Sequence, residues 1–140
     1  MLERFKVPEK DRVYVPVERI RAATEAILRH SGVPAEDAAS SADVLIKNDL
    51  RGVESHGVSN GLRRYAAEYG AKTLNATPEY KVIRESKTTM TVDADGALGI
   101  HVGPWAMQIA IDKAKEFGMA AVAVKNSGHL AGCGYYAMMA

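Results

Sequence analysis

The period at which apolar residues recur changes near Pro78, and this change constrains the fold more than any other feature of the sequence. Before it, three stretches show helical spacing: 17–30, Pro34 to about 50, and one that ends at Gly70. After it, the stretches 80–84 and 88–93 alternate in character and are rich in β-branched residues, as strands are. The sequence therefore predicts a mixed α/β fold in which three helices precede any strand.

The second half adds a crossover helix to this sheet. Residues 85–87 separate the two predicted strands and indicate a hairpin, and 104–117 form a helical stripe closed by Gly118. The continuous apolar run 119–124 is typical of a strand covered on both faces. We divide the chain into an N-terminal helical segment, 1–78, and the start of a mixed α/β cofactor-binding domain, 79–140, which we expect to be incomplete.

Composition excludes several classes of protein. The chain has 140 residues, of which 47% are hydrophobic and 25% charged, as in an ordinary globular domain. Its 18 basic and 17 acidic residues are spread evenly, so no basic patch favours nucleic acid. Cys133 is the only cysteine, and no run of about 18 apolar residues indicates a membrane span. We expect a cytoplasmic protein that binds neither nucleic acid nor membrane.

Two segments concentrate polar groups, and ESHGVSNGLRRY (54–65) is the first. In one interpretation Gly57 breaks a helix, Ser55 caps the next helix, and Arg63 and Arg64 are solvated. In the other, His56 is a proton carrier and an arginine binds a carboxylate through its fork of donors, with Tyr65 on the same wall. Residue types alone leave both open.

The second segment follows the predicted buried strand. Asn126, Ser127, Gly128 and His129 lead from it into a glycine-rich turn that contains Gly132. Ligands of open α/β sheets bind beyond the carboxyl ends of strands, where glycines let backbone N–H groups approach closely. His129 is thus a candidate acid or base. The alternative is a histidine satisfied by backbone carbonyls in a tight turn.

Other motifs are missing. The glycines at 96, 99 and 103 do not follow the G-x-G-x-x-G order, and no P-loop is present, so an ordinary Rossmann domain is not supported. The four histidines show no metal-ligand spacing, so we predict no metal site. Ser55 is not the serine of a G-x-S-x-G elbow, because Val53 stands in the first position; the pattern GVSNG (57–61) centres on Ser59 instead.

The segments DLRGVESHGVSNGLRRYAAEY (49–69) and TVDADGALGIHVGPWAMQIAIDKAKEFGMAAVAVKNSGHLAGCGYYAMMA (91–140) resemble the NAD(P)-dependent malate/L-lactate dehydrogenase family. That family also includes ureidoglycolate and sulfolactate dehydrogenases, diketogulonate reductase and the cyclic ketimine reductases. The resemblance implies a non-Rossmann oxidoreductase that moves a hydride between NAD or NADP and C2 of a 2-hydroxy or 2-oxo acid. It also implies an N-terminal portion of a longer enzyme.

By this resemblance His129 is the catalytic acid/base and His56 a second catalytic histidine. Many relatives carry an arginine four residues after the latter, where this chain has Asn60, so we assign the carboxylate to Arg64 or Arg63. Tyr65 and Ser55 complete the predicted substrate site. The residues expected to contact the cofactor are Asn126, Ser127, Gly128 and Gly132.

Two rival functions stay open. A cyclic imine reductase would use the same histidine to protonate a nitrogen. A non-catalytic truncated module would act through oligomerisation, because the apolar end GYYAMMA predicts a covered surface. In either enzyme interpretation the partners are a small carboxylate substrate and further copies of the chain, as a homodimer or higher homo-oligomer.

Overall fold

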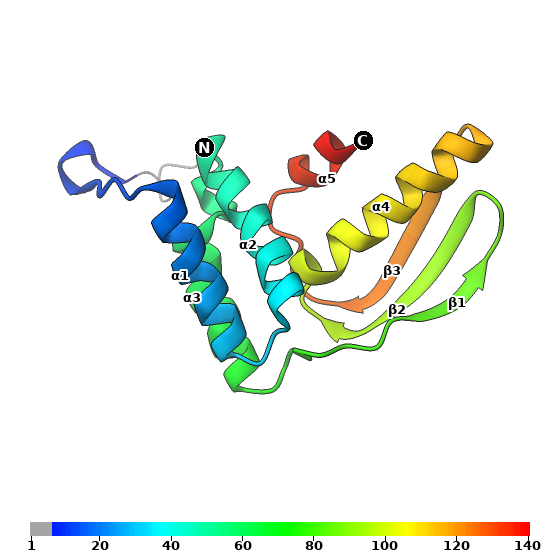
Figure 1. Cartoon of the computed structure of the whole chain (residues 1–140), viewed down its shortest axis with the longest axis horizontal. Coiled ribbons are helices and arrows are strands. Elements are labelled where there is room, and N and C mark those ends of the chain that lie inside the picture. Colours follow the sequence, from blue (N-terminus) through cyan, green and yellow to red (C-terminus); the bar gives the residue numbers. More distant parts are fainter. Residues whose placement is uncertain (1–6) are drawn as a thin grey trace.

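The structure, a computed structural model, describes residues 7–140 (Figure 1). Short 3-10 helices, η2 (Glu9–Asp11) and η3 (Glu54–His56), accompany the main elements. In chain order the main elements are α1 (Val17–His30), α2 (Ala35–Leu50), α3 (Val58–Gly70), β1 (Lys81–Glu85), β2 (Thr89–Ala97), α4 (Gly99–Phe117), β3 (Ala121–Ser127) and α5 (Gly134–Met139). The predicted mixed α/β class, with three α-helices before the first strand, is confirmed.

The helices α1, α2 and α3 lie side by side, and the sheet with α4 extends away from them (Figure 1). The main hydrophobic cluster lies among the helices and draws in buried side chains from both halves of the chain. Its members from the second half include Leu98, Ile100, Ala131 and Tyr135. The loop that carries His129 is therefore anchored on the helical half.

The sheet has the order β1-β2-β3. β1 and β2 pair antiparallel, as the predicted hairpin requires, while β2 and β3 pair parallel. A parallel pair needs a crossover connection, and α4 supplies it across one face of the sheet (Figure 1). The carboxyl ends of β2 and β3 thus lie together, near the start of α4.

Helix α4 begins at Gly99, earlier than the stripe from Pro104 indicated. A proline inside a helix cannot donate to the carbonyl four residues before it, which here is that of Ile100. The Ser41 hydroxyl on α2 donates to this carbonyl at 3.4 Å. Because α2 replaces the missing donor, the helix tolerates the proline and its first turn extends back to Gly99.

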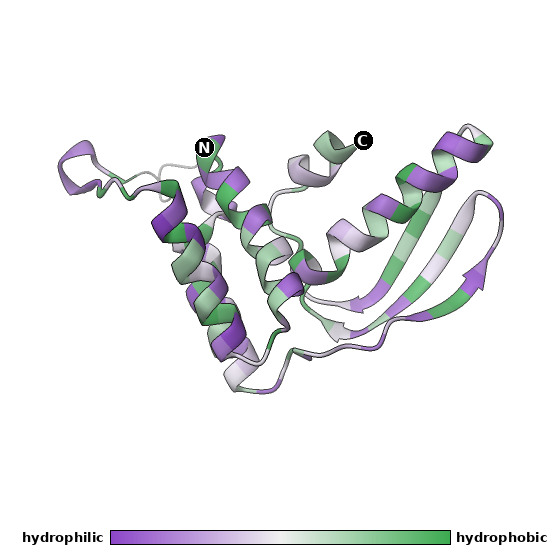
Figure 2. Cartoon of the chain, viewed as in Figure 1, coloured by the Kyte–Doolittle hydropathy of each residue, from purple (hydrophilic) through white to green (hydrophobic). Residues whose placement is uncertain are grey.

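Strand β3 also differs from the prediction. Its residues are exposed or only partly buried, so the described chain does not cover it on both faces. β3 lies at an edge of the sheet, where one long side of the strand has no neighbour among the described residues. Figure 2 nevertheless shows β3 hydrophobic over most of its length. The apolar run 119–124 thus predicted a strand, but β3 is not buried and runs from Ala121 to Ser127, so Asn126 and Ser127 belong to the strand and not to the turn after it.

The C-terminal helix α5 is partly anchored. The Tyr135 side chain is buried, and its hydroxyl donates to Asp43 on α2 at 2.9 Å. Met138 on the same helix stays 55% exposed. Within residues 7–140, no helix combines the length and apolar character needed to cross a membrane.

Candidate acid–base site

The imidazole rings of His56 and His129 lie together, although 73 positions separate them in the sequence. Their ring centroids are 5.7 Å apart and the ring planes differ by 16°, so the rings stack. His56 is the last residue of η3, and His129 follows the carboxyl end of β3. Two chain segments that carried separate predictions therefore meet at one place.

The buried side chain of Tyr65 forms a hydrogen bond with the His129 ring. Its side chain is only 1% exposed, and its hydroxyl lies 2.8 Å from Nδ1 of His129. The backbone N–H of Ala131 also donates to this Nδ1, at 3.2 Å. Because an amide N–H can only donate, Nδ1 acts as an acceptor here, and the Tyr65 hydroxyl then donates to it as well. In this arrangement the neutral His129 ring carries its proton on Nε2.

The charges around His129 favour its neutral form. Partial desolvation lowers the pKa of His129, and the nearby positive charges of Arg64 and His56 lower it further. The Glu68 carboxylate opposes them but does not reverse the shift. Burial raises the pKa of Tyr65, which keeps its hydroxyl protonated. At neutral pH the site thus presents a neutral imidazole and a neutral phenol.

The two candidate arginines differ in their surroundings. The Arg64 guanidinium lies 5.0 Å from the centre of the Tyr65 ring and forms a 3.6 Å ion pair with Glu68 on the next turn of α3. Its charge reaches His129, as the lowered pKa of that histidine indicates. Arg63 is exposed and forms no ion pair with any residue from 7 to 140. Arg64 is therefore the arginine that the fold places beside the histidines.

Ser55 orients His56 and does not cap a helix. Its hydroxyl lies 2.9 Å from Nδ1 of His56. The N–H of Val58, at the start of α3, instead donates to Oδ2 of Asp49 at 2.9 Å. A Cβ on Gly57 would collide with the same carboxylate, which explains why glycine occupies this position. The acid that caps α3 thus comes from α2.

The residues predicted to contact a cofactor are engaged with protein atoms. Asn126 has a positive φ of 54° and donates through its side chain to Asp93 at 2.9 Å. A Cβ on Gly128 would lie 3.0 Å from the Leu74 side chain, and one on Gly132 would lie 2.5 Å from Oδ1 of Asn48. Close packing against protein therefore accounts for both glycines. Ser127 is exposed at the end of β3.

The described residues supply only some of the groups that a nicotinamide-dependent reaction needs. The imidazole of His129 and the guanidinium of Arg64 lie at one place, and these are the residue types that proton transfer and carboxylate binding require. The two glycines predicted to contact the cofactor, Gly128 and Gly132, lie against the side chains of Leu74 and Asn48. Contact between residues 126–132 and a cofactor stays a prediction.

The residue that sequence reasoning missed is Asn48, in the last turn of α2. Its side-chain Nδ2 donates to the backbone carbonyl of His56 at 3.3 Å, and it is 1% exposed. Helical spacing places it on the same face as Val44 and Leu45, which are fully buried. The sequence signal for Asn48 is a polar residue on the apolar face of a predicted helix.

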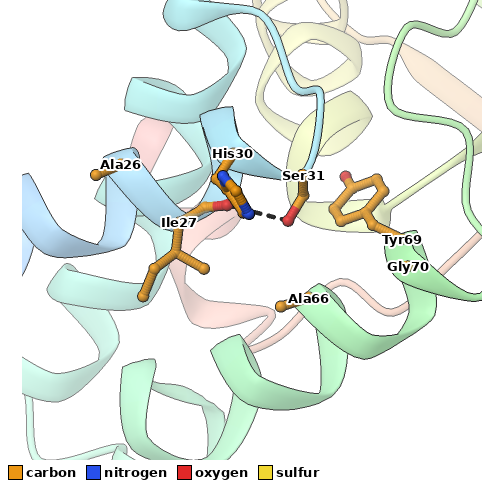
Figure 3. A pocket seen from close by; sticks show the side chains of 7 residues that line it. All are labelled: Ala26, Ile27, His30, Ser31, Ala66, Tyr69 and Gly70. Carbon is orange, nitrogen blue, oxygen red and sulfur yellow. Dashed lines mark hydrogen bonds between the residues drawn. The ribbon is translucent and has the colours of Figure 1, made fainter.

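Two hollows of the described surface are lined by neither His56 nor His129. One, of about 530 Å³, lies between the C-terminal ends of α1 and α3 and is lined by His30 and Tyr69 among others (Figure 3). The other, of about 460 Å³, lies between the segment from Val7 to Ile20 and the ends of α2 and α3. His129 itself is exposed. Within residues 7–140, no group of three or more His, Cys, Asp or Glu side chains is arranged to hold a metal ion.

The fold and the site together describe a non-Rossmann α/β protein with two stacked histidines near the carboxyl end of a parallel strand. The sequence pattern of the malate/L-lactate dehydrogenase family matches residues 15–140, and the chain belongs to this family.

Individual relatives agree. The chain is 42% identical over 140 residues to malate dehydrogenase of Pyrococcus horikoshii. This match covers 100% of this chain and 38% of the relative. It is 40% identical over 114 residues to L-sulfolactate dehydrogenase of Methanocaldococcus jannaschii, over 81% of this chain and 33% of that protein. The solved structure of the P. horikoshii OT3 malate dehydrogenase matches with a TM-score of 0.91 and 42% identity, over 100% of this chain and 40% of that one. The chain thus spans less than half the length of the relatives it matches.

Proposed function

We propose that this protein is an NAD(P)-dependent oxidoreductase that moves a hydride between the nicotinamide and C2 of a 2-hydroxy or 2-oxo acid. The observation that carries the proposal is the environment of His129. Its Nδ1 is held by Tyr65, its ring stacks on His56, and Arg64 lies close by. Removal of a hydride from an alcohol carbon requires the hydroxyl proton to leave, and an imidazole is suited to take it near neutral pH.

The Tyr65 hydroxyl allows His129 to work in both directions, because a hydroxyl both donates and accepts. In reduction, the His129 imidazolium donates its Nε2 proton to the oxygen that gains charge at C2. The ring is then neutral with its remaining proton on Nδ1, and that N–H donates to the Tyr65 oxygen. In oxidation the proton moves from the substrate hydroxyl to Nε2, so the neutral ring must first carry its proton on Nδ1, donate it in a hydrogen bond to the Tyr65 oxygen and give up the bond from the Ala131 N–H. The nicotinamide, when bound, accepts or supplies the hydride.

The carboxylate of such a substrate needs a cation at a fixed distance from the proton carrier. We assign this role to Arg64, since its guanidinium lies against the ring of Tyr65, which in turn bonds His129. A guanidinium binds a carboxylate through two parallel N–H donors. In the absence of substrate, Glu68 pairs with this arginine at 3.6 Å, and an incoming carboxylate would replace it.

Turnover tests the proposal in the protein expressed from its complete reading frame. NADH and NADPH oxidation would be followed with 2-oxo acids and, for the rival imine reductase, with cyclic imine carboxylates. We expect His129→Ala to lower kcat by about a hundredfold or more, because general acid–base groups contribute at least that much. His30→Ala is the matched control, since His30 lines the hollow of Figure 3. Turnover of His129→Ala within about threefold of the wild type would refute the role.

A further inference from the structure

Asn48 lies between the two segments that carry the histidines. Its Nδ2 donates to the backbone carbonyl of His56 at 3.3 Å. On its other side, its Oδ1 lies so close to Gly132 that a Cβ there would approach it to 2.5 Å. Gly132 belongs to the loop that carries His129, and the Ala131 N–H in that loop donates to the His129 ring. One side chain on α2 thus contacts both segments.

Because Asn48 is buried, these contacts set the orientation of its side-chain amide. Asn48 is 1% exposed in a helix face that is mostly apolar. A buried amide without partners is costly, so its orientation is set by the partners that it finds. Its backbone carbonyl also accepts the N–H of Val53 at 2.8 Å, which turns the chain from α2 into η3. The amide is therefore fixed by its backbone as well as by its surroundings.

Gly132 approaches the amide at a distance that only glycine allows. The atoms nearest to an added Cβ are all from Asn48, at 2.5 Å to Oδ1 and 3.0 Å to both Cγ and Nδ2. An alanine at 132 would have to displace the amide. Displacement would break the bond to the His56 carbonyl, because that bond is already 3.3 Å long. The separation of the two loops is thus set through this side chain.

We infer that Asn48 is a positioning residue that holds His56 and His129 in stacking distance by spanning the space between their loops. Its importance for turnover rests on the proposed function, whereas its effect on the distance between the rings does not. Among the described residues it forms no hydrogen bond with either imidazole, and it acts through the backbone of one loop and the packing of the other.

The distance between the rings tests this inference directly in the 140-residue chain. NMR would follow the nuclear Overhauser effect between the ring protons of His56 and His129, together with the pH midpoint of each ring. In Asn48→Ala and Asn48→Asp we expect this effect to be lost. The midpoint of His129 should shift upward, because desolvation and the charges of Arg64 and His56, which now lower its pKa, would weaken while Glu68 still raises it.

Asn60→Ala is the matched control. Asn60 also donates through its side chain to η3, at the Glu54 carbonyl, but it is exposed and lies outside the space between the loops. This variant should keep both the effect and the midpoint. An inter-ring effect of wild-type strength in Asn48→Ala and Asn48→Asp would overturn the inference, whatever turnover assays show.

A second pair of variants covers the case in which Asn48 variants fold poorly. Gly132→Ala should lose the inter-ring effect and lower Tm, because its Cβ collides with Asn48. In an Asn48→Ala background the collision partner is gone, so the further fall in Tm caused by Gly132→Ala should be smaller. Equal falls in Tm in both backgrounds would show that Asn48 does not set the loop position.

Discussion

Removal of the Tyr65 hydroxyl tests one hydrogen bond of the site, the bond between that hydroxyl and Nδ1 of His129. We expect Tyr65→Phe to keep the buried ring and the α3 helix while losing the bond to His129 Nδ1. The free energy of unfolding should fall by about 1 kcal/mol, the usual net value of a hydrogen bond. Urea unfolding monitored by circular dichroism measures this change. Tyr14→Phe is the control, because Tyr14 is 83% exposed and should show no effect.

His129 should also make stability depend on pH. Its folded-state pKa is lowered from 6.5, chiefly by desolvation and then by Arg64 and His56. Between that lowered pKa and 6.5 the unfolded chain binds a proton that the folded chain does not, so stability falls as the pH drops through this window. We expect Tm to fall less in His129→Gln than in the wild type between pH 7.5 and 5. Parallel pH profiles of the two proteins would contradict the lowered pKa.

The choice between Arg64 and Arg63 is open to a comparison of conservative variants. Arg64→Lys removes the two-pronged donor while keeping the charge, so KM for carboxylate substrates should rise about tenfold or more in the protein expressed from its complete reading frame. Arg63→Lys, on an exposed side chain without an ion pair to residues 7–140, should leave KM unchanged. A rise in KM for Arg63→Lys alone would move the carboxylate to that arginine.

At this scale the sequence predicted candidate side chains but not how they contact one another, and the chemical role of each candidate stays a prediction. Both histidines stand in recognisable motifs, yet nothing in the sequence states that their rings stack. Tyr65 was predicted to contact substrate, and the structure places its hydroxyl on His129, because its helical position turns it into the core. Its predicted contact with substrate stays a prediction. Distances across 64 positions depend on tertiary packing, which local patterns do not contain.

Among the elements, α3 depends on a cap supplied by another helix. The Asp49 carboxylate accepts the Val58 N–H at 2.9 Å, and burial raises its pKa. Asp49→Ala should lower the free energy of unfolding by about 1 kcal/mol, as the loss of an N-terminal cap does. Asp49→Asn keeps an oxygen acceptor and removes a desolvated charge, so its loss should be smaller. Urea unfolding above pH 6 would compare them, and equal losses would contradict the capping role.

The elements show where local patterns succeed and where they fail. Helical spacing predicted α1 and α2 closely because their buried faces repeat within one segment. The start of α4 was placed too late because Pro104 is a strong local signal. Its effect is offset by Ser41, which lies far away in the sequence and donates to the Ile100 carbonyl. A long-range hydrogen bond thus decided a boundary that local chemistry alone would misplace.

The whole molecule is stabilised unevenly. The main hydrophobic cluster joins the helices and includes Leu98 and Tyr135 from the second half of the chain. Among the described residues, the cluster at the sheet has three buried members, Ala94, Ala97 and Val102. The edge strands of the sheet are exposed, and the side chains of Val82 and Ile83 on β1 are each more than half exposed to solvent. The division at residue 78 stays a prediction. Most of the apolar burial nevertheless lies on the helical side.

This uneven burial predicts a gradient of amide hydrogen exchange in the 140-residue chain. Amides of α2, which has seven buried residues, should open only in global unfolding, whereas those of β1 and β3 should exchange through local opening at least tenfold faster. Mass spectrometry at low protein concentration measures both. If the proposed homo-oligomer forms through the sheet, protection of β3 should rise with protein concentration while that of α2 stays constant. Protection of β3 equal to that of α2 at every concentration would contradict the gradient, because an exposed edge strand cannot resist local opening as a buried helix does.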